Sequence, residues 1–332
     1  MSRRALDPER LAAVSARYLG GPVTVEGLRR LSGGASRETW AFDAALPGGT
    51  SRHALVLRRD PGSSIGGTDR ATEYSLLRAA ADAGVPVPSV RFLLGPEDDL
   101  GDGFVMDRIE GETIPRKILR DPEYAAARGN LAAECGAIAA QIHAVDPDGV
   151  SGLAVQGARE QIEQYRAILD GFGEPHPAFE LGLRWLEEHM PAAAAAAADA
   201  PRLVHGDFRN GNFIVGPEGI RAVLDWELAH LGDPVEDLGW LCVKSWRFGE
   251  VERRAGGFGS AQELVDAYER AGGSRVDPEH LRYWEAFGTL KWGVICEVQC
   301  FTHLNGLVRS VELAALGRRV AEMEWDLLEL VT

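Results

Sequence analysis

The sequence predicts an α+β protein of two lobes: a small antiparallel sheet with one packed helix, followed by a larger lobe that is mainly helical. The first third of the chain contains short runs rich in Val, Leu, Phe and Trp, separated by Gly, Pro and Asp, which is typical of strands. From residue 117 onward, apolar residues recur at three- and four-residue spacing, which is typical of helices. The length of 332 residues is sufficient for about two domains.

The first lobe is expected to span residues 1–110. Asp7-Pro8-Glu9 combines a helix N-cap, a proline suited to the first helical position and a first-turn acid, so a short helix should begin there and end near Gly20-Gly21. A second helix is expected from Thr68 to Ala83, between the third and fourth of five strands. The strands are expected at residues 23–31, 37–45, 52–59, 90–95 and 103–109.

The second lobe, residues 111–332, is expected to begin after the breaks at Gly111 and Pro115. The segment from Arg202 to Trp226 interrupts its helical pattern with apolar runs at 203–204, 213–215 and 222–224, so we expect a short hairpin with polar groups crowded at one end. The helices are expected from Arg128 to His143, Gln156 to Leu169, Pro177 to Ala198, Gly259 to Ala271 and Asp277 to Leu330.

The charge of the chain limits its partners. The 35 basic and 50 acidic residues give a net charge of −15, which argues against nucleic acid or an anionic membrane as the main binding target. Residues 1–110 are nearly neutral, so most of the negative charge lies in the second lobe. The three lysines are Lys117, Lys244 and Lys291, which excludes a lysine-bearing phosphate-binding loop from the first lobe.

The cysteine pattern and the N-terminus bear on location. The four cysteines form no C-x-x-C pair, and the N-terminus lacks an apolar leader segment. No stretch approaches eighteen uninterrupted apolar residues. We therefore expect a reduced, cytoplasmic protein that is neither secreted nor membrane-spanning, and that is a monomer or a homodimer.

A polar loop in the predicted hairpin concentrates reactive side chains. It runs from His205 to Asn212 as HGDFRNGN, and Asp225 ends the following strand. Asp207 and Asn212 have the spacing of the H-R-D-x-x-x-x-N catalytic loop, with glycine in place of arginine. Mg²⁺ needs one or two carboxylates besides waters and phosphates, so Asp225 and the Asn212 amide oxygen suffice, and Asp207 is left to face a substrate hydroxyl. An Asx-rich turn is the simpler alternative, but it does not explain the whole constellation.

The first lobe has features of a nucleotide site. The small residues Ser32, Gly33, Gly34, Ala35 and Ser36 lie between two predicted strands, where backbone N–H groups could approach phosphates, although an ordinary hairpin turn has the same composition.

The third predicted strand and the helix after it add side chains to this site. Val56 and Arg58 share a face, so Val56 would cover a base while Arg58 reaches the phosphates. Glu73, in the following helix, is placed to pair with Arg58. A surface glutamate without that role is the alternative.

Three motifs are typical of one enzyme family. Residues 203–215 read LVHGDFRNGNFIV, residues 223–239 read VLDWELAHLGDPVEDLG, and residues 103–111 read GFVMDRIEG, which looks like an inter-lobe hinge. On these motifs the chain resembles the aminoglycoside phosphotransferase family, which has the bilobal protein-kinase-like fold. Within that family it is most similar to the phosphotransferase domains associated with acyl-CoA dehydrogenases.

The resemblance implies a phosphotransferase that uses ATP and Mg²⁺, with GTP as an alternative co-substrate. It implies that Asp207 is the catalytic base, that His205 braces the loop, and that Arg209 belongs to the catalytic set. Asn212 and Asp225 would be the Mg²⁺ ligands. The acceptor would be a hydroxyl group of a small molecule.

The resemblance also assigns supporting residues. Asp237 would be the buried aspartate that ties the catalytic loop to the next helix, and Glu227 would support the site. Adenine would be bound by the backbone around Asp107 and Ile109, beside Met106.

The sequence departs from the family at Arg58, where most members carry lysine. Arginine keeps the charge and can bind phosphate bidentately, and the dehydrogenase-associated branch also looks to carry it. A catalytically silent nucleotide-binding scaffold is therefore an alternative. A metal-dependent hydrolase that uses His205 and the nearby acids is another.

The acceptor is the least constrained part of the prediction. Lys244, Trp246 and Arg247 belong to the one basic, aromatic patch of the acidic lobe, and an anionic acceptor such as a hydroxyacyl-CoA would need such a patch. A solvated face without function is the simpler interpretation. An aminoglycoside, being polycationic, would instead suit the acidic lobe. The similarity within the family favours the acyl-CoA type.

Overall fold

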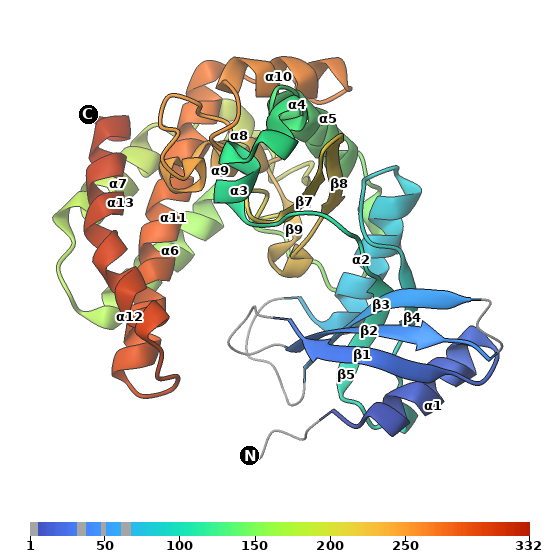
Figure 1. Cartoon of the computed structure of the whole chain (residues 1–332). Coiled ribbons are helices and arrows are strands. Elements are labelled where there is room, and N and C mark those ends of the chain that lie inside the picture. Colours follow the sequence, from blue (N-terminus) through green and yellow to red (C-terminus); the bar gives the residue numbers. More distant parts are fainter. Residues whose placement is uncertain (1–5, 32–37, 48–50, 61–67) are drawn as a thin grey trace.

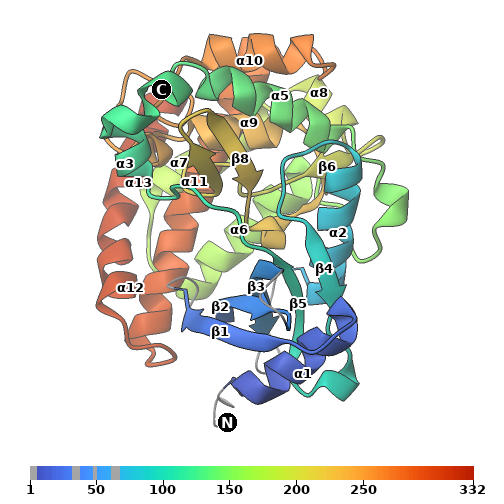
Figure 2. The same ribbon diagram turned by 45° about the vertical axis from the view of Figure 1, so that its right-hand side comes forward.

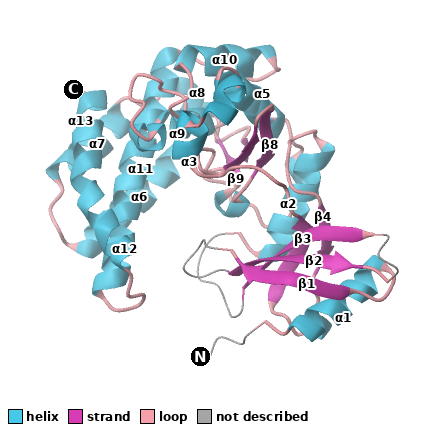
Figure 3. Cartoon of the chain, in the orientation of Figure 1, coloured by secondary structure: helices cyan, strands magenta, loops and turns pink. Residues whose placement is uncertain are grey.

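The structure, a computed structural model, describes residues 6–31, 38–47, 51–60 and 68–332. It consists of a lobe built on a sheet and a larger lobe built mainly of helices, which confirms the predicted α+β class (Figures 1 and 3). The chain passes from the first lobe to the second through residues 108–114, directly after the last strand of the sheet.

The first lobe is a five-stranded antiparallel sheet with the strand order β1-β2-β3-β5-β4. Each strand lies close to where the sequence predicts it. The strands are β1 (Thr24–Arg30), β2 (Glu38–Ala45), β3 (Arg52–Asp60), β4 (Val90–Leu93) and β5 (Asp102–Asp107), and the helices of this lobe are α1 (Pro8–Leu19) and α2 (Arg70–Asp82).

The two faces of the sheet are covered by different helices, because side chains alternate along each strand. Leu55 of β3 is fully buried in a cluster with Leu11 of α1. Val56 belongs to the opposite face and to the cluster that contains Leu76 of α2. Arg58 follows Val56 on that face, as the sequence predicts, and reaches the second lobe from there.

The second lobe is organised around its longest helix. The 27-residue α11 contacts α9, α13, α7 and α6, and Figures 1 and 2 show α13 and α6 beside it. No helix in the described part of the chain is both long enough and apolar enough to cross a membrane. The helices are α3 (Pro115–Arg120), α4 (Ala125–Arg128), α5 (Leu131–His143), α6 (Ala158–Phe172), α7 (Pro177–Glu188), α8 (Ala192–Ala196), α9 (Val235–Cys242), α10 (Ala261–Arg270), α11 (Pro278–Leu304), α12 (Val311–Leu316) and α13 (Val320–Val331).

Two helices that the sequence predicts as continuous are interrupted. The helix predicted from Pro177 to Ala198 ends at Glu188, because Pro191 disfavours helical backbone before it, and the chain restarts as α8. The helix predicted from Asp277 to Leu330 ends at Leu304. Gly306 then takes a φ of 73°, and the chain turns back so that α12 and α13 pack on α11.

Two short ribbons position the polar loop. β7 (Phe213–Gly216) and β8 (Gly219–Val223) form the predicted hairpin. β6 (Arg202–Val204) does not join this hairpin but pairs with β9 (His230–Gly232). No pattern in the sequence indicates β9, because three residues are too few to show a period.

The close packing of α9 on α11 gives a test of the fold. A Cβ atom added at Gly239 would overlap the backbone and side chain of Trp284. We expect Gly239→Ala to lower the free energy of unfolding by about 1–3 kcal/mol through overpacking. Gly171→Ala is the control, because Gly171 also lies in a helix but has open space beside it, and this variant should be neutral or more stable by up to about 1 kcal/mol. Urea denaturation measures both, and equal effects would contradict the expectation.

Candidate functional site

The elements of the second lobe bring the polar segments together. Residues 205–212 form the loop between β6 and β7, and Asp225 follows β8 after one residue. The Leu224 N–H donates to the Asn212 carbonyl oxygen over 2.8 Å, which holds the chain just before Asp225 beside the loop. Asp237 lies in the first turn of α9. Segments separated in sequence therefore meet at one end of the hairpin.

Asp237 holds the backbone of the loop. Its fully buried carboxylate accepts hydrogen bonds from the N–H groups of His205 (2.8 Å) and Gly206 (2.9 Å), and Oδ2 also lies 3.1 Å from Nε2 of His143. Burial raises the pKa of Asp237, but the hydrogen bond and charge of His143 and the backbone donors bring that pKa below its usual value. Asp237 thus ties the loop to α9 in the way that the family resemblance implies.

The neighbouring residue of the loop must be glycine. Gly206 has a φ of 79°, and a Cβ atom there would collide with the carbonyl oxygen of Leu228. The tight turn lets consecutive backbone N–H groups point at one carboxylate.

His205 is buried beneath the loop. Its Nε2 lies 3.0 Å from the Leu224 carbonyl oxygen, which can only accept, and its Nδ1 lies 3.2 Å from the Asp207 N–H, which can only donate. These partners fit a neutral imidazole with its proton on Nε2. Burial lowers the pKa of His205, against the opposing charges of Asp237 and Asp207. The geometry is that of a brace between the loop and the end of β8.

Asp207 is held by three donors. Oδ1 accepts hydrogen bonds from Arg209 Nε (2.8 Å) and Trp240 Nε1 (2.9 Å), and Oδ2 accepts one from Asn212 Nδ2 (2.6 Å). Arg209 in turn lies over the ring of Trp246, with its Cζ 4.4 Å from the ring centroid. The Asp207 side chain is 17% exposed. The carboxylate therefore has a fixed orientation and remains accessible.

Asn212 and Asp225 offer the oxygens that a hard divalent cation prefers. The Asn212 amide donates through Nδ2 to Asp207, and among the described residues no donor contacts its amide oxygen. Asp225 has a φ of 61°, and its side chain is 45% exposed. Partial burial opposes its ionisation, but the charge and hydrogen bond of Arg58 hold the pKa of Asp225 below its usual value. These donors fit an Mg²⁺ ion that completes its shell with waters and phosphate oxygens.

Arg58 connects the two lobes. Its Nη1 donates to Asp225 Oδ1 over 2.8 Å, and its Nε lies 3.4 Å from Glu73 Oε1, so the pair that the sequence predicts is present. Glu73 is 1% exposed and also pairs with Arg70. Burial lowers the pKa of Arg58, but the charges of Glu73 and Asp225 raise it well above its usual value. Arg58 is therefore a permanent cation beside the proposed metal ligands.

Glu227 lies at a second connection between the lobes. Its carbonyl oxygen accepts hydrogen bonds from the N–H group (3.0 Å) and the hydroxyl group (3.1 Å) of Thr68, just before α2. The backbone of Glu227 thus anchors the start of the helix that carries Glu73. The charge of the Glu227 side chain also contributes to raising the pKa of Arg58.

The hinge residues lie at the end of β5 and just after it, where the chain leaves the sheet for the second lobe. Met106 of β5 is buried and pairs with Val56 of β3. Asp107 is fixed by Arg91, whose Nε and Nη2 both lie 2.7 Å from its carboxylate oxygens. Ile109 is half-buried, and its N–H has no backbone acceptor among the described residues. The small residues Ser32, Gly33, Gly34, Ala35 and Ser36 lie outside the described residues, so their role stays a prediction.

The basic patch expected around Lys244, Trp246 and Arg247 is not a free cationic surface. Arg247 is buried and donates through Nη2 to Glu285 over 2.7 Å, and Trp246 is buried beneath Arg209. Lys244 Nζ lies 2.7 Å from Asp326. Carboxylates far away in the sequence therefore already neutralise these cations, and the contact of Lys244, Trp246 and Arg247 with an anionic acceptor stays a prediction.

Two residues at the site carry more than the sequence indicates. Trp240 is buried, and its indole N–H donates a hydrogen bond to Asp207. Lys291 is buried in α11, with Nζ 3.3 Å from the Gly206 carbonyl oxygen, 3.2 Å from Glu236 Oε1 and 5.0 Å from the centroid of the Trp240 ring. The sequence contains one signal for Lys291, which is its position inside an apolar helical pattern. A lysine buried in such a helix requires polar partners, so its presence there indicates a buried polar site.

Comparison with known proteins gives one family. A model described as the phosphotransferase enzyme family matches residues 27–274. Acyl-CoA dehydrogenase family member 10 of Mus musculus is 33% identical over 205 residues, which cover 57% of this chain and 18% of that protein. Acyl-CoA dehydrogenase family member 11 of Gallus gallus is 27% identical over 339 residues, which cover 92% of this chain and 41% of that protein. The chain thus spans less than half the length of these relatives.

Solved structures share the fold. A protein of Ralstonia eutropha, provisionally described as an aminoglycoside phosphotransferase, superposes with a TM-score of 0.75 at 24% identity, covering 98% of both chains. A thermostable mutant of aminoglycoside phosphotransferase APH(4)-Ia, in complex with ADP and hygromycin B, gives a TM-score of 0.58 at 19% identity and covers 97% of both chains. At these identities the likeness shows the fold, including its protein-kinase-like arrangement of lobes, and nothing about the acceptor.

The neutral state of His205 predicts a pH dependence of stability. Because its pKa is lowered by folding, the unfolded chain binds a proton below about pH 6.5 where the folded chain does not. The stability that His205 contributes is therefore present above that pH and is lost as the pH falls toward the lowered pKa. We expect the free energy of unfolding to fall less between about pH 7.5 and 5.5 in His205→Gln than in the native chain. Urea denaturation at both pH values measures this change, and the variant His189→Gln, at an exposed histidine, is the control. An equal fall in the free energy of unfolding for His205→Gln and the native chain would refute the explanation.

Proposed function

The chain belongs to the phosphotransferase enzyme family, and from this premise we propose that it is a small-molecule kinase that uses ATP and Mg²⁺. The reaction would move the γ-phosphate of ATP to a hydroxyl group of the acceptor. The observation that carries the proposal is the gathering of Asp207, Asn212 and Asp225 at one partly exposed place, with Arg58 of the other lobe in contact with Asp225.

Asp207 would orient the acceptor hydroxyl and take its proton late in the transfer. Its carboxylate is held by Arg209 and Trp240 through one oxygen, and its side chain is partly exposed. Lys291 supports this orientation from below, because it contacts both the Gly206 carbonyl oxygen and the Trp240 ring. Such positioning matters because phosphoryl transfer depends mainly on alignment and charge stabilisation.

Asn212 and Asp225 would hold the Mg²⁺ ion. When bound, this ion supplies the positive charge that offsets the charge developing on the transferred phosphoryl oxygens. Arg58 lies 2.8 Å from Asp225, so its guanidinium is already placed where phosphates would approach a metal at Asp225. Arginine can meet two phosphate oxygens at once, which compensates for the absence of the usual lysine.

The nucleotide would lie against the sheet of the first lobe. Val56 and Met106 are paired across β3 and β5 on the face that also carries Arg58, and they would cover the base. The Ile109 N–H and the Asp107 carbonyl oxygen would bind its edge, and the small residues 32–36 would cover the phosphates. ATP is the proposed co-substrate, and GTP is the alternative.

The acceptor that we propose is a hydroxyacyl-CoA-type compound. Its support is the similarity to acyl-CoA dehydrogenase family members 10 and 11, of which this chain matches only a part. The neutralised patch around Lys244 adds nothing to this support. An aminoglycoside is the alternative, because residues 111–332 carry 21 basic against 35 acidic residues and would attract a polycation.

We also propose a cytoplasmic setting, as a monomer or a homodimer. The four cysteines are free, and three of them are buried. Burial raises the pKa of Cys242 and that of Cys296 to about 12, so both groups stay neutral, unreactive thiols. Unpaired, buried thiols are compatible with a reducing environment.

One screen separates the candidate functions. We would measure γ-phosphate transfer from MgATP to hydroxyacyl-CoAs and to aminoglycosides side by side. Transfer to neither, together with a rise in Tm on adding MgATP, would favour the catalytically silent nucleotide-binding scaffold. Phosphate release from acceptor esters without nucleotide would favour the metal-dependent hydrolase.

The role of Asp207 is tested by Asp207→Asn. This change keeps the shape but removes the proton acceptor, so we expect kcat to fall by about 10²–10⁴-fold while MgATP still binds. The control is Asp82→Asn, because Asp82 is exposed at the end of α2 and should leave kcat unchanged. Phosphate-transfer kinetics and MgATP titration by calorimetry measure the two effects. A native kcat in Asp207→Asn would refute the assignment.

The role of Arg58 is tested by a pair of variants. Arg58→Met removes the cation that pairs with Asp225 and leaves Glu73 paired with Arg70 alone, and we expect kcat/KM for ATP to fall by about 10²-fold. Arg58→Lys should keep more of the rate, because it restores a positive charge at the same place. Arg52→Met, which removes an exposed cation from the same strand, is the control. Equal kcat/KM values in all three variants would show that Arg58 has no part in ATP binding.

A further inference from the structure

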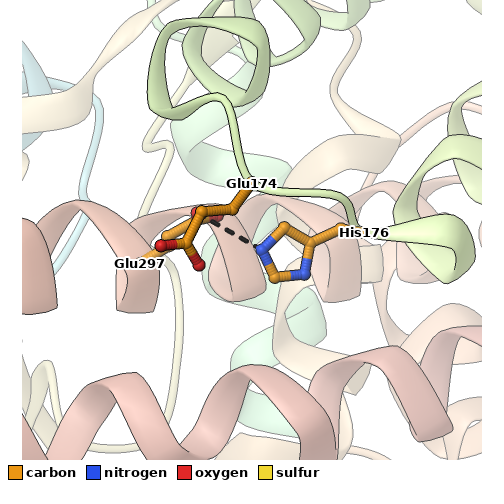
Figure 4. Close-up of side chains that lie close together, drawn as sticks. All are labelled: Glu174, His176 and Glu297. Atoms are coloured by element: carbon orange, nitrogen blue, oxygen red, sulfur yellow. Dashed lines mark ion pairs between the residues drawn. The ribbon is translucent and has the colours of Figure 1, made fainter.

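A second group of metal-competent side chains lies in the larger lobe, away from the residues assigned above. Glu174 and His176 belong to the loop between α6 and α7, and Glu297 belongs to α11. One ligand atom of each of the three lies within 4.8 Å of those of the others. Figure 4 shows the three side chains turned toward one another from the loop and from the long helix.

Glu297 is the unusual member of the group. The residue is 4% exposed, yet neither oxygen of its carboxylate has a hydrogen-bond partner among the residues that the structure describes. His176 Nε2 is also buried without a hydrogen bond within that part of the chain. The two groups approach to 3.3 Å as an ion pair. An unsatisfied buried carboxylate is costly, so it points to a ligand that would complete it.

The second nitrogen of the imidazole is already engaged. His176 Nδ1 lies 2.9 Å from Glu324 Oε1 of α13. Metal-binding imidazoles almost always give their other ring N–H to a carboxylate or carbonyl group, which fixes the ring and makes the free nitrogen a better ligand. The contact with Glu324 therefore leaves Nε2 facing Glu297 as the coordinating atom.

The loop holds its two side chains in place. Gly173 ends α6 with a φ of 69°, and Glu174 and His176 are each followed by a proline. A proline disfavours helical backbone in the residue before it, and His176 accordingly takes a non-helical φ of −121° and ψ of 79°. The short non-helical segment brings the ligand atoms of Glu174 and His176 within 4.8 Å of each other and of Glu297.

We propose that Glu174, His176 and Glu297 bind one divalent transition-metal ion, with Zn²⁺ the best match to the ligands. A tetrahedral Zn²⁺ ion with bonds of about 2.0–2.2 Å places neighbouring ligand atoms about 3.4 Å apart. The Nε2–Oε1 separation of 3.3 Å is close to this value, and a carboxylate oxygen of the exposed Glu174 lies within 4.8 Å of both atoms. Imidazole selects Zn²⁺ over Mg²⁺ or Ca²⁺, which prefer oxygen ligands alone.

The charges around the site favour a dication. Glu174, Glu297 and Glu324 place three carboxylates around one imidazole. A Zn²⁺ ion would neutralise its two carboxylate ligands, and Glu324 would remain paired with the imidazole. The ion would fasten the α6–α7 loop to α11 and, through His176 and Glu324, to α13. It would bind the folded chain in preference to the unfolded one and so raise stability.

Metal binding to the native full-length chain tests the proposal. The protein is stripped with a chelator, and Zn²⁺ is added in the presence of excess Mg²⁺, which occupies the oxygen ligands at Asn212 and Asp225. We expect one Zn²⁺ per chain by elemental analysis after dialysis, and a rise in Tm of about 5 °C at a hundred-fold excess over the dissociation constant. Absence of bound Zn²⁺ would overturn the proposal.

Matched variants show whether the ion lies at this place. Glu297→Gln keeps the shape of the side chain and should weaken Zn²⁺ binding at least about ten-fold, whereas Glu188→Gln, an exposed change at the end of α7, should bind as the native chain does. Circular dichroism in chelator verifies that each variant is folded. Equal Zn²⁺ affinity in both variants would place the ion elsewhere.

A spectroscopic measurement guards against binding at the cysteines. Co²⁺ in a site of one nitrogen and carboxylate oxygens gives visible d–d bands without the intense near-ultraviolet absorption of a cobalt–thiolate bond. We expect this spectrum in the native chain and its loss in Glu297→Gln. Thiolate absorption would contradict the proposal and assign the ion to a cysteine such as the half-buried Cys300.

Discussion

The candidate site depends on one buried carboxylate, that of Asp237. A buried charge is tolerable only when hydrogen bonds and opposite charge satisfy it, and Asp237 meets this condition with two consecutive backbone N–H groups and His143. Those N–H groups belong to His205 and Gly206, so satisfying the carboxylate fixes the backbone just before Asp207. The Gly206 carbonyl oxygen is then held by Lys291 from the other side. The direction of the Asp207 side chain is thus a consequence of where α9 and α11 pack.

A series of alternating charges joins this loop to the first lobe. Asp60 pairs with Arg70, Arg70 with Glu73, Glu73 with Arg58, and Arg58 with Asp225. Most of the series is buried, so removing one charge would leave its neighbours uncompensated in a poorly solvated place. Only Asp225, at the end, is substantially exposed. A phosphate that binds Arg58, or a metal ion that binds Asp225, would therefore replace part of the Arg58–Asp225 ion pair. That ion pair is the accessible end of the series that joins the two lobes.

Much of the fold and the central loop could be predicted because the information is local. Side-chain alternation placed Val56 and Arg58 on one face, and the spacing of Asp207 and Asn212 indicated the loop. The reversal of the chain at Gly306 could not be predicted from the spacing of apolar residues. This spacing is the same for one long helix and for the three helices α11, α12 and α13 that fold back on one another. The neutralisation of the basic patch could not be predicted either, because it depends on contacts between distant segments. Sequence gives charges, but the partner of Arg247 is Glu285, 38 residues away and visible only after folding.

The buried carboxylates of the larger lobe differ in whether the chain supplies them with hydrogen-bond donors, and this difference supports the proposed metal site. Asp233 accepts from His280 and Trp284, Glu236 from His230 and Gln161, and Glu285 from Arg247. Folding has thus supplied donors to acids buried as deeply as Glu297. Within the described residues Glu297 is the buried carboxylate whose two oxygens both lack a hydrogen bond, and the nearest nitrogen, His176 Nε2, lacks one too. Two groups of complementary ligand type, facing each other across 3.3 Å without a hydrogen-bond partner among the described residues, are explained together by a single bound ion.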